Sequence, residues 1–152
     1  MGKNNFIKNV KPRKNSKYHQ GLIRPDTLKK YYDSCKNDPI IYRSGLEYQF
    51  IQFCENSPSV MKWASEPLAI KYYSNLDQKQ CNYYPDYVIE NSKGVKCIVE
   101  LKPYNQTVKP SISDSRWLKE QWIKNVDKWN AAKKFCDDHG LKFIIVTEKF
   151  FE

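Results

Sequence analysis

The chain has 152 residues, the length of one domain, and its 40% hydrophobic content predicts a packed globule rather than a disordered chain. No apolar run approaches the length of a membrane span, and the N-terminus lacks the apolar segment of a secretory signal, so no membrane association is expected. The net charge is +9, and the five scattered cysteines contain no C-x-x-C pair, which disfavours a zinc site.

The basic charge is concentrated at the start of the chain. Residues 1–30 hold nine Lys or Arg and one Asp, a net charge of +8, whereas residues 31–152 carry 17 basic and 16 acidic residues, a net charge of +1. Such a segment is typical of a nucleic-acid binder, and a solubilising or protein-docking tail is the alternative. We predict a basic N-terminal arm over residues 1–30 and one domain over residues 31–152. The arm residues expected to contact DNA are Lys11, Arg13, Lys14 and Lys17.

The domain begins with a predicted helix followed by two strands. The helix starts at Ser44, has apolar residues at helical spacing, and ends near Asn56, where Ser57-Pro58-Ser59 interrupts the pattern. Residues 60–63 and 68–73 are expected to be strands, and residues 75–80 are expected to be a polar loop.

The second half of the domain alternates strands with one long helix. A turn over residues 91–94 separates the first two of these strands. The long helix is capped by Ser113 or Asp114, ends at Gly140, and is followed by one more strand. We read its stripe of Trp117, Trp122, Val126, Trp129, Ala132 and Cys136 as core packing. The predicted strands are residues 83–90, 95–102 and 143–146. This order predicts an α/β (α+β) fold with a central mixed β-sheet flanked by helices.

A carboxylate and an amine lie at the end of the second of these strands. Residues two apart on a strand share a face, so Glu100 and Lys102 point the same way. A carboxylate can hold a divalent ion, and a lysine can position water or neutralise charge on a phosphate. An exposed salt bridge on an edge strand would give the same E-x-K pattern.

The hairpin loop decides whether Asp86 can join Glu100. With a four-residue loop, residues 91–94, Asp86 faces Val99. With a three-residue loop, residues 92–94, Asp86 lies opposite Glu100. The shorter loop favours a final residue in the left-handed region, where Gly94 fits at least cost. Two opposed carboxylates repel each other, and a bound Mg²⁺ would relieve that repulsion.

Glu47 fits two interpretations. Ser44-Gly45-Leu46-Glu47 matches the S-x-x-E capping box, in which Glu47 bonds to a backbone N–H. Its spacing to Phe50, Ile51 and Cys54 also places it toward the apolar side of the helix, where it could support a metal site.

These residues resemble the PD-(D/E)xK nuclease superfamily. A helical acid, then Pro85-Asp86 on one strand, then Glu100-Leu101-Lys102 on its partner follow that order and spacing. Four further segments resemble the head-completion nucleases of T-even-type tailed phages, and TnsA-like endonucleases and phage junction resolvases share the core more distantly. These segments are Tyr42 to Glu47, Trp63-Ala64-Ser65-Glu66, Tyr84 to Tyr87 and Thr147-Glu148.

The resemblance implies a restriction-endonuclease-like fold and Mg²⁺-dependent cleavage of DNA phosphodiesters, with Mn²⁺ able to substitute. Asp86 and Glu100 would be metal ligands, Lys102 would orient water or neutralise charge, and Glu47 would touch the metal directly or through water. Glu66 is a weaker candidate for a site residue, and the alternative is that it is a carboxylate in a β-turn or on the surface. Further DNA contacts are expected from Arg43, Lys124 and Lys128. Gln121 lies on the same long helix as the two lysines and could also touch the DNA backbone; the alternative is that this side of the helix is simply solvated.

The implied setting is the phage head. The expected substrate is double-stranded DNA, further partners would be phage head or portal proteins, and the place of action would be the cytoplasm of the infected bacterium or the virion. Two alternatives stay open. One is a virion protein that grips DNA without cutting it, and the other is a junction or recombination nuclease with the same core.

Overall fold

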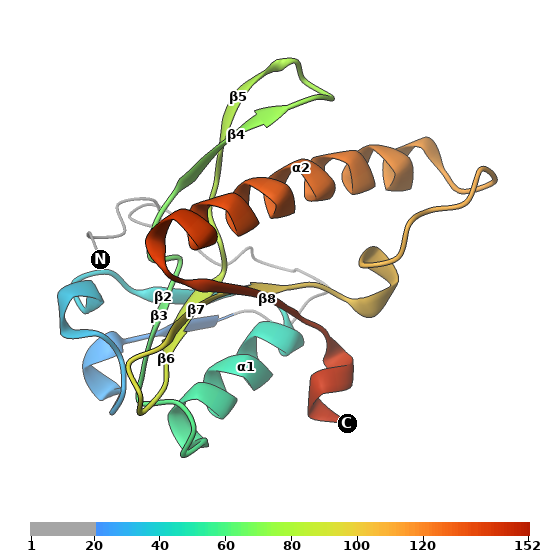
Figure 1. The fold of residues 1–152 in the computed structure, drawn as a ribbon. Coiled ribbons are helices and arrows are strands. Elements are labelled where there is room, and N and C mark those ends of the chain that lie inside the picture. Colours follow the sequence, from blue (N-terminus) through green and yellow to red (C-terminus); the bar gives the residue numbers. More distant parts are fainter. Residues whose placement is uncertain (1–20) are drawn as a thin grey trace.

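A four-stranded mixed sheet organises the protein (Figure 1), whose computed structural model describes residues 21–152. The strand order is β3-β6-β7-β8, with two antiparallel pairs and a parallel pair between β7 and β8. A parallel pair needs a long crossover, which the helix α2 (Arg116–His139) supplies. The expected mixed sheet and restriction-endonuclease-like fold are confirmed. The strands are β3 (Lys62–Ser65), β6 (Tyr87–Glu90), β7 (Lys96–Leu101) and β8 (Lys142–Val146).

Two helices cover opposite faces of this sheet. In Figure 1, α2 (Arg116–His139) lies above the sheet and α1 (Gly45–Asn56) lies below it. On the α1 side, the ring of Phe50 lies 4.9 Å from that of Tyr87. On the α2 side, Trp129, Ala132 and Cys136 are buried. Within the described residues, neither helix is both long and apolar enough to cross a membrane.

The remaining elements are short. The hairpin of β4 and β5 stands above the central sheet alongside α2 (Figure 1), and β1 pairs with β2. The bounds are β1 (Gly21–Ile23), β2 (Ile40–Tyr42), β4 (Ile70–Ser74), β5 (Lys79–Tyr83), and the 3-10 helices Pro25–Thr27, Asp33–Cys35, Tyr104–Gln106 and Glu148–Phe151.

The packed part of the chain includes residues that we assigned to the basic arm. Residues 21–23 pair with β2, and Pro25 is buried. Leu28 packs against the core, so residues 21–30 belong physically to the domain. The other arm residues, 1–20, lie outside the described residues, and with them lie Lys11, Arg13, Lys14 and Lys17.

Three sequence predictions about elements are corrected. The strand predicted over residues 83–90 begins only at Tyr87, because Pro85 cannot donate a ladder hydrogen bond, and Tyr83 instead ends β5, which starts at Lys79 inside the predicted polar loop of residues 75–80. The cap of α2 is Ser115, whose hydroxyl accepts from the N–H of Leu118, and not Ser113 or Asp114. Trp117 is 60% exposed rather than in the core, because the first turns of α2 extend past the sheet (Figure 1). The helix end at Gly140, with φ of 67°, is confirmed.

The register between β6 and β7 follows the three-residue loop. Tyr87 pairs with Val99 and Val88 with Ile98, and the N–H of Asn91 bonds to the carbonyl of Val95 at 3.0 Å. Gly94 closes the loop with φ of 78°, in the left-handed region. Extending this register by one residue places Asp86 opposite Glu100, as the shorter loop predicts.

We expect Gly94→Ala to lower the free energy of unfolding by about 1 kcal/mol, because a Cβ is unfavourable at positive φ. Urea unfolding would measure the loss. Gly45→Ala is the matched control: neither position has an atom within 4 Å of an added Cβ, but only Gly94 has positive φ. Equal stability of the two variants would contradict the strained-loop account of the register.

Candidate active site

Asp86 directly precedes β6 and is fixed there by the backbones of two neighbours. Its Oδ2 accepts a hydrogen bond from the N–H of Leu101 at 2.7 Å. Its carbonyl accepts from the N–H of Glu66 at 2.7 Å. The residue before it, Pro85, is fully buried and interrupts the strand. The carboxylate is therefore held against the end of β7, where Glu100 lies.

Glu100 is a buried carboxylate with two side-chain donors. It is 5% exposed, and its Oε2 accepts from the hydroxyl of Tyr83 at 2.6 Å and from the Nε1 of Trp129 at 3.3 Å. Burial first, and then the charge of Glu100, raise the pKa of Tyr83 far above its usual value, so the hydroxyl stays a donor. Both bonds use Oε2, and they hold the carboxylate in one orientation at the end of β7.

Asp86 and Glu100 lie close enough for the charge of one to act on the other. Burial is the largest cause that raises the pKa of Asp86 well above its usual range. The charge of Glu100 and a hydrogen bond with it raise this pKa further, and the N–H of Leu101 opposes the shift. Repulsion between two such carboxyl groups is relieved either by a proton or by a bound cation.

Two lysines complete this end of the sheet. Lys102 directly follows β7, and its N–H bonds to the carbonyl of Val146 at 3.0 Å, which fixes the strand end. Lys128 comes from α2, is half-buried, and places its Nζ 5.9 Å from the ring centroid of Tyr83. Burial and then Lys102 lower the pKa of Lys128, whereas Glu100 and Asp86 raise it. The charges of Lys102, Glu100 and Asp86 thus all act on the amine of Lys128.

Glu47 caps α1 and lies near the site. Its N–H donates to the hydroxyl of Ser44 at 3.1 Å, and its Oε2 accepts from the N–H of Arg43 at 2.9 Å. The carboxylate therefore reaches one residue beyond the position that a standard capping box predicts. Burial raises the pKa of Glu47, the N–H and charge of Arg43 oppose this, and the charges of Glu66 and Glu100 add to it.

Arg43 links Glu47 with Glu66. Its Nη1 lies 3.4 Å from the Oε1 of Glu66, whose own backbone has a positive φ of 43°. Burial raises the pKa of Glu66, and Arg43 opposes the shift. Arg43, proposed from sequence to contact DNA, is thus engaged with the neighbouring carboxylates.

The predicted ligand set is assembled in part. Asp86 and Glu100 come together, but over residues 21–152 no group of three or more His, Cys, Asp or Glu side chains is arranged to hold a metal. Glu47 as a third ligand stays a prediction. Lys124 points to Asp77, with 3.8 Å between Nζ and Oδ2, so one acid already partners this predicted DNA contact.

Two residues that contact Glu100 are not singled out by the sequence analysis. The sequence pattern places Tyr83 at the start of a strand and Trp129 in a stripe of core residues. Both are buried, and both donate to Glu100. Trp129 lies next to Lys128, so one turn of α2 supplies both a donor and an amine. No local pattern marks either residue, because their partner lies 17 or 29 residues away in sequence.

The sequence of this chain is similar to those of known nucleases. Residues 57–148 match the family described as the TnsA-like endonuclease N-terminal domain. The head completion nuclease of Enterobacteria phage T4 is 33% identical over 141 residues, which cover 86% of this chain and 91% of that protein. The chain belongs to this nuclease family. The expected relationship to head-completion and TnsA-like nucleases is confirmed, and the family segment contains Asp86, Glu100, Lys102 and Lys128, whereas Arg43 and Glu47 precede it.

We expect Asp86→Asn to make the protein less sensitive to alkaline pH when EDTA removes divalent ions. A raised folded-state pKa means that Asp86 contributes stability below the ordinary aspartate pKa of about 4, and that this contribution is lost as the pH rises through the folded value. Urea unfolding at mildly acidic and mildly alkaline pH would measure the difference.

The matched control is Asp138→Asn, an exposed acid paired with Lys134. It should leave the pH dependence of the wild type unchanged. If Asp86→Asn also unfolds with the wild-type pH dependence, the pKa of Asp86 is not raised in the folded protein.

Proposed function

We propose that this member of the nuclease family is a Mg²⁺-dependent endonuclease that hydrolyses phosphodiester bonds of double-stranded DNA during phage head completion. The observation that carries the proposal is the convergence of Asp86 and Glu100 at one end of the sheet, beside Lys102 and Lys128. Glu100 is buried and the other three groups are half-buried, an arrangement that costs stability, and phosphodiester hydrolysis can use both carboxylates and amines.

The donor set fits a hard divalent cation. Mg²⁺ is commonly bound by one or two carboxylates together with water and substrate phosphate oxygens. Asp86 and Glu100 would hold it, with Glu47 close enough for its charge to act on the site. When bound, the cation would neutralise charge on the phosphate. Mn²⁺ has similar ligand preferences and should substitute.

The other residues have roles that follow from their positions. Tyr83 and Trp129 hold Glu100 in one orientation through its Oε2. Lys102 would donate to the attacking water or to a phosphate oxygen. Lys128 would add a second positive charge facing the same phosphate, and its packing beside Tyr83 keeps it in place.

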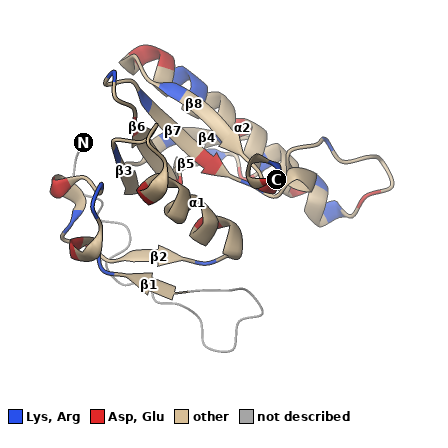
Figure 2. Ribbon diagram, turned by 90° about the horizontal axis from the view of Figure 1, so that it is seen from below, with Lys and Arg blue, Asp and Glu red and all other residues tan. Residues whose placement is uncertain are grey.

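The expected DNA path uses the basic N-terminal segment. In the described part, basic and acidic positions are interspersed along α2 (Figure 2), consistent with the net charge of only +1 over residues 31–152. Long-range attraction to DNA would therefore come mainly from the segment before the domain. Phage head or portal proteins would be further partners, and the infected cell's cytoplasm or the virion would be the place of action.

We expect Asp86→Asn, Glu100→Gln and Lys102→Met each to reduce DNA cleavage by at least about 100-fold, because each removes a group that acts on the reacting phosphate. Nicking of supercoiled plasmid and cutting of linear duplex, with Mg²⁺ and with EDTA, would measure the loss. DNA binding should persist, since one side chain changes within a larger contact.

Glu120→Gln and Lys133→Met are controls that remove the same kinds of charge outside the site, and they should cleave normally. Added Mg²⁺ or Mn²⁺ should raise the melting temperature of the wild type but not of Asp86→Asn, a readout independent of activity. Active variants would refute the site. A wild type that binds DNA but never cleaves it would favour the DNA-gripping head protein, and a preference for branched DNA would favour a junction nuclease.

We expect deletion of residues 1–20 to weaken duplex binding and to flatten its salt dependence. The deleted segment contains six Lys or Arg and no Asp or Glu, and each lost phosphate contact reduces the slope by about 0.9. Fluorescence anisotropy at several salt concentrations would measure both quantities. An unchanged salt slope would mean that the segment binds something other than DNA.

A further inference from the structure

The hairpin of β4 and β5 has one polar face turned to solvent. In its register Lys71 lies opposite Asn82, and Tyr73 lies opposite Gln80. All four side chains are exposed, and Tyr73 is 50% exposed despite its aromatic ring. Neither strand contains an Asp or Glu. We call these four residues the ribbon face.

The opposite face of the hairpin is packed. Ile70, Tyr72 and Tyr83 are buried and form a cluster with Ala132 of α2. This alternation of buried and exposed residues is that of a half-buried antiparallel pair. The ribbon face therefore cannot rotate inward, because doing so would expose the apolar cluster.

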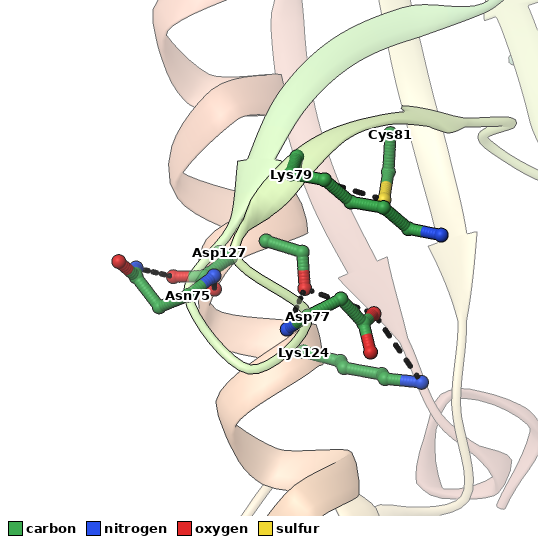
Figure 3. Close-up of polar contacts among 7 residues, drawn as sticks. Asn75, Asp77, Lys79, Cys81, Lys124 and Asp127 are labelled. Atoms are coloured by element: carbon green, nitrogen blue, oxygen red, sulfur yellow. Dashed lines mark hydrogen bonds and ion pairs between the residues drawn. The ribbon is translucent and has the colours of Figure 1, made fainter.

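The tip of the hairpin is fastened to α2. Both the N–H and the Nδ2 of Asn75 donate to the carboxylate of Asp127, at 2.9 and 2.8 Å. Asp77 accepts from the hydroxyl of Ser74 at 3.1 Å and pairs with Lys124 (Figure 3). The acids of this region thus face the helix rather than the ribbon face, and they hold the hairpin in one orientation.

The hairpin is also joined directly to the candidate active site. Strand β5 ends at Tyr83, whose hydroxyl donates to Glu100, and the chain reaches Asp86 three residues later. A molecule held on the ribbon face is therefore fixed relative to the two carboxylates. A shallow depression lined by Lys71, Gln80, Cys81 and Asn82 lies on this part of the hairpin.

We propose that the ribbon face enters the major groove of the DNA duplex whose backbone is cut at Asp86 and Glu100. The inference rests on the proposed function and adds which surface positions the substrate. A two-stranded ribbon fits the major groove, and Lys, Asn and Gln are side chains that hydrogen bond to base edges there. The absence of acids on both strands removes repulsion from the flanking phosphates.

The side chains favour DNA over a protein partner. The core of a protein interface is usually rich in aromatic and apolar groups, whereas three of these four side chains are amides or an amine. All four side chains of the ribbon face can donate hydrogen bonds, and Lys71 adds one positive charge. A protein that docks on this face is kept as an outcome of the test.

The test compares two triple variants of the full chain. The ribbon variant is Lys71→Ala/Gln80→Ala/Asn82→Ala. The control variant is Lys133→Ala/Gln52→Ala/Asn130→Ala, which removes the same three residue types from exposed positions on the two helices. Circular dichroism should show both variants folded, because every substituted side chain is exposed.

Binding to a short duplex is measured by anisotropy, with EDTA present to prevent cleavage. We expect the ribbon variant to bind at least about tenfold more weakly than the control variant, a loss of the size that base-edge contacts produce. Methyl green, which occupies the major groove, should displace the wild type, whereas distamycin, which occupies the minor groove, should not.

Equal affinities of the two variants would overturn the proposal and point to a protein partner for the ribbon face. Displacement by distamycin alone would overturn it in favour of the minor groove. The proposed function is judged separately, by cleavage. A wild type that fails to cleave with any divalent ion refutes the endonuclease, whereas a cleaving wild type with an unaffected ribbon variant refutes only the groove contact.

Discussion

The pairing register of β6 and β7 is the constraint on which the rest of this structure depends. A slip of one residue would move Asp86 from opposite Glu100 to opposite Val99, and it would turn the buried Tyr87 and Val88 to the wrong faces. The register is held at one end by the loop that Gly94 closes and at the other by the bond from Leu101 to Asp86. The same pairing therefore builds the core and brings two carboxylates together.

The helix α2 joins the fold to the candidate chemistry. It makes the crossover that a parallel β7–β8 pair requires, and its middle turn supplies Trp129 to Glu100 and Lys128 to the same region. It also anchors the β4–β5 hairpin through Asp127 and Lys124. One helix thus fixes the sheet, the carboxylate pair and the hairpin relative to one another, which is the rigidity that a positioned site needs.

The sequence supported much of the fold because its signals are local. Alternation and helical spacing identify most elements, Gly140 marks the end of α2, and Gly94 selects the shorter hairpin loop. The errors arise where tertiary packing decides between locally equivalent choices. Ser115 caps α2 although Ser113 and Asp114 offer equivalent side chains, and Trp117 follows the apolar stripe although no sheet lies beneath it. The spacing of the residues predicts neither the cap at Ser115 nor the exposure of Trp117, because both depend on where α2 meets the sheet.

The sequence by itself determined the family, the mixed sheet and the pairing that brings Asp86 to Glu100, because motif spacing and a two-residue strand period need no distant information. Only the tertiary structure decided that Glu100 is buried between Tyr83 and Trp129, that Lys128 joins the site, and that Glu47 bonds to Arg43. It also decided that residues 21–30 pack onto the domain. These contacts join separate elements, and the docking of the elements sets them.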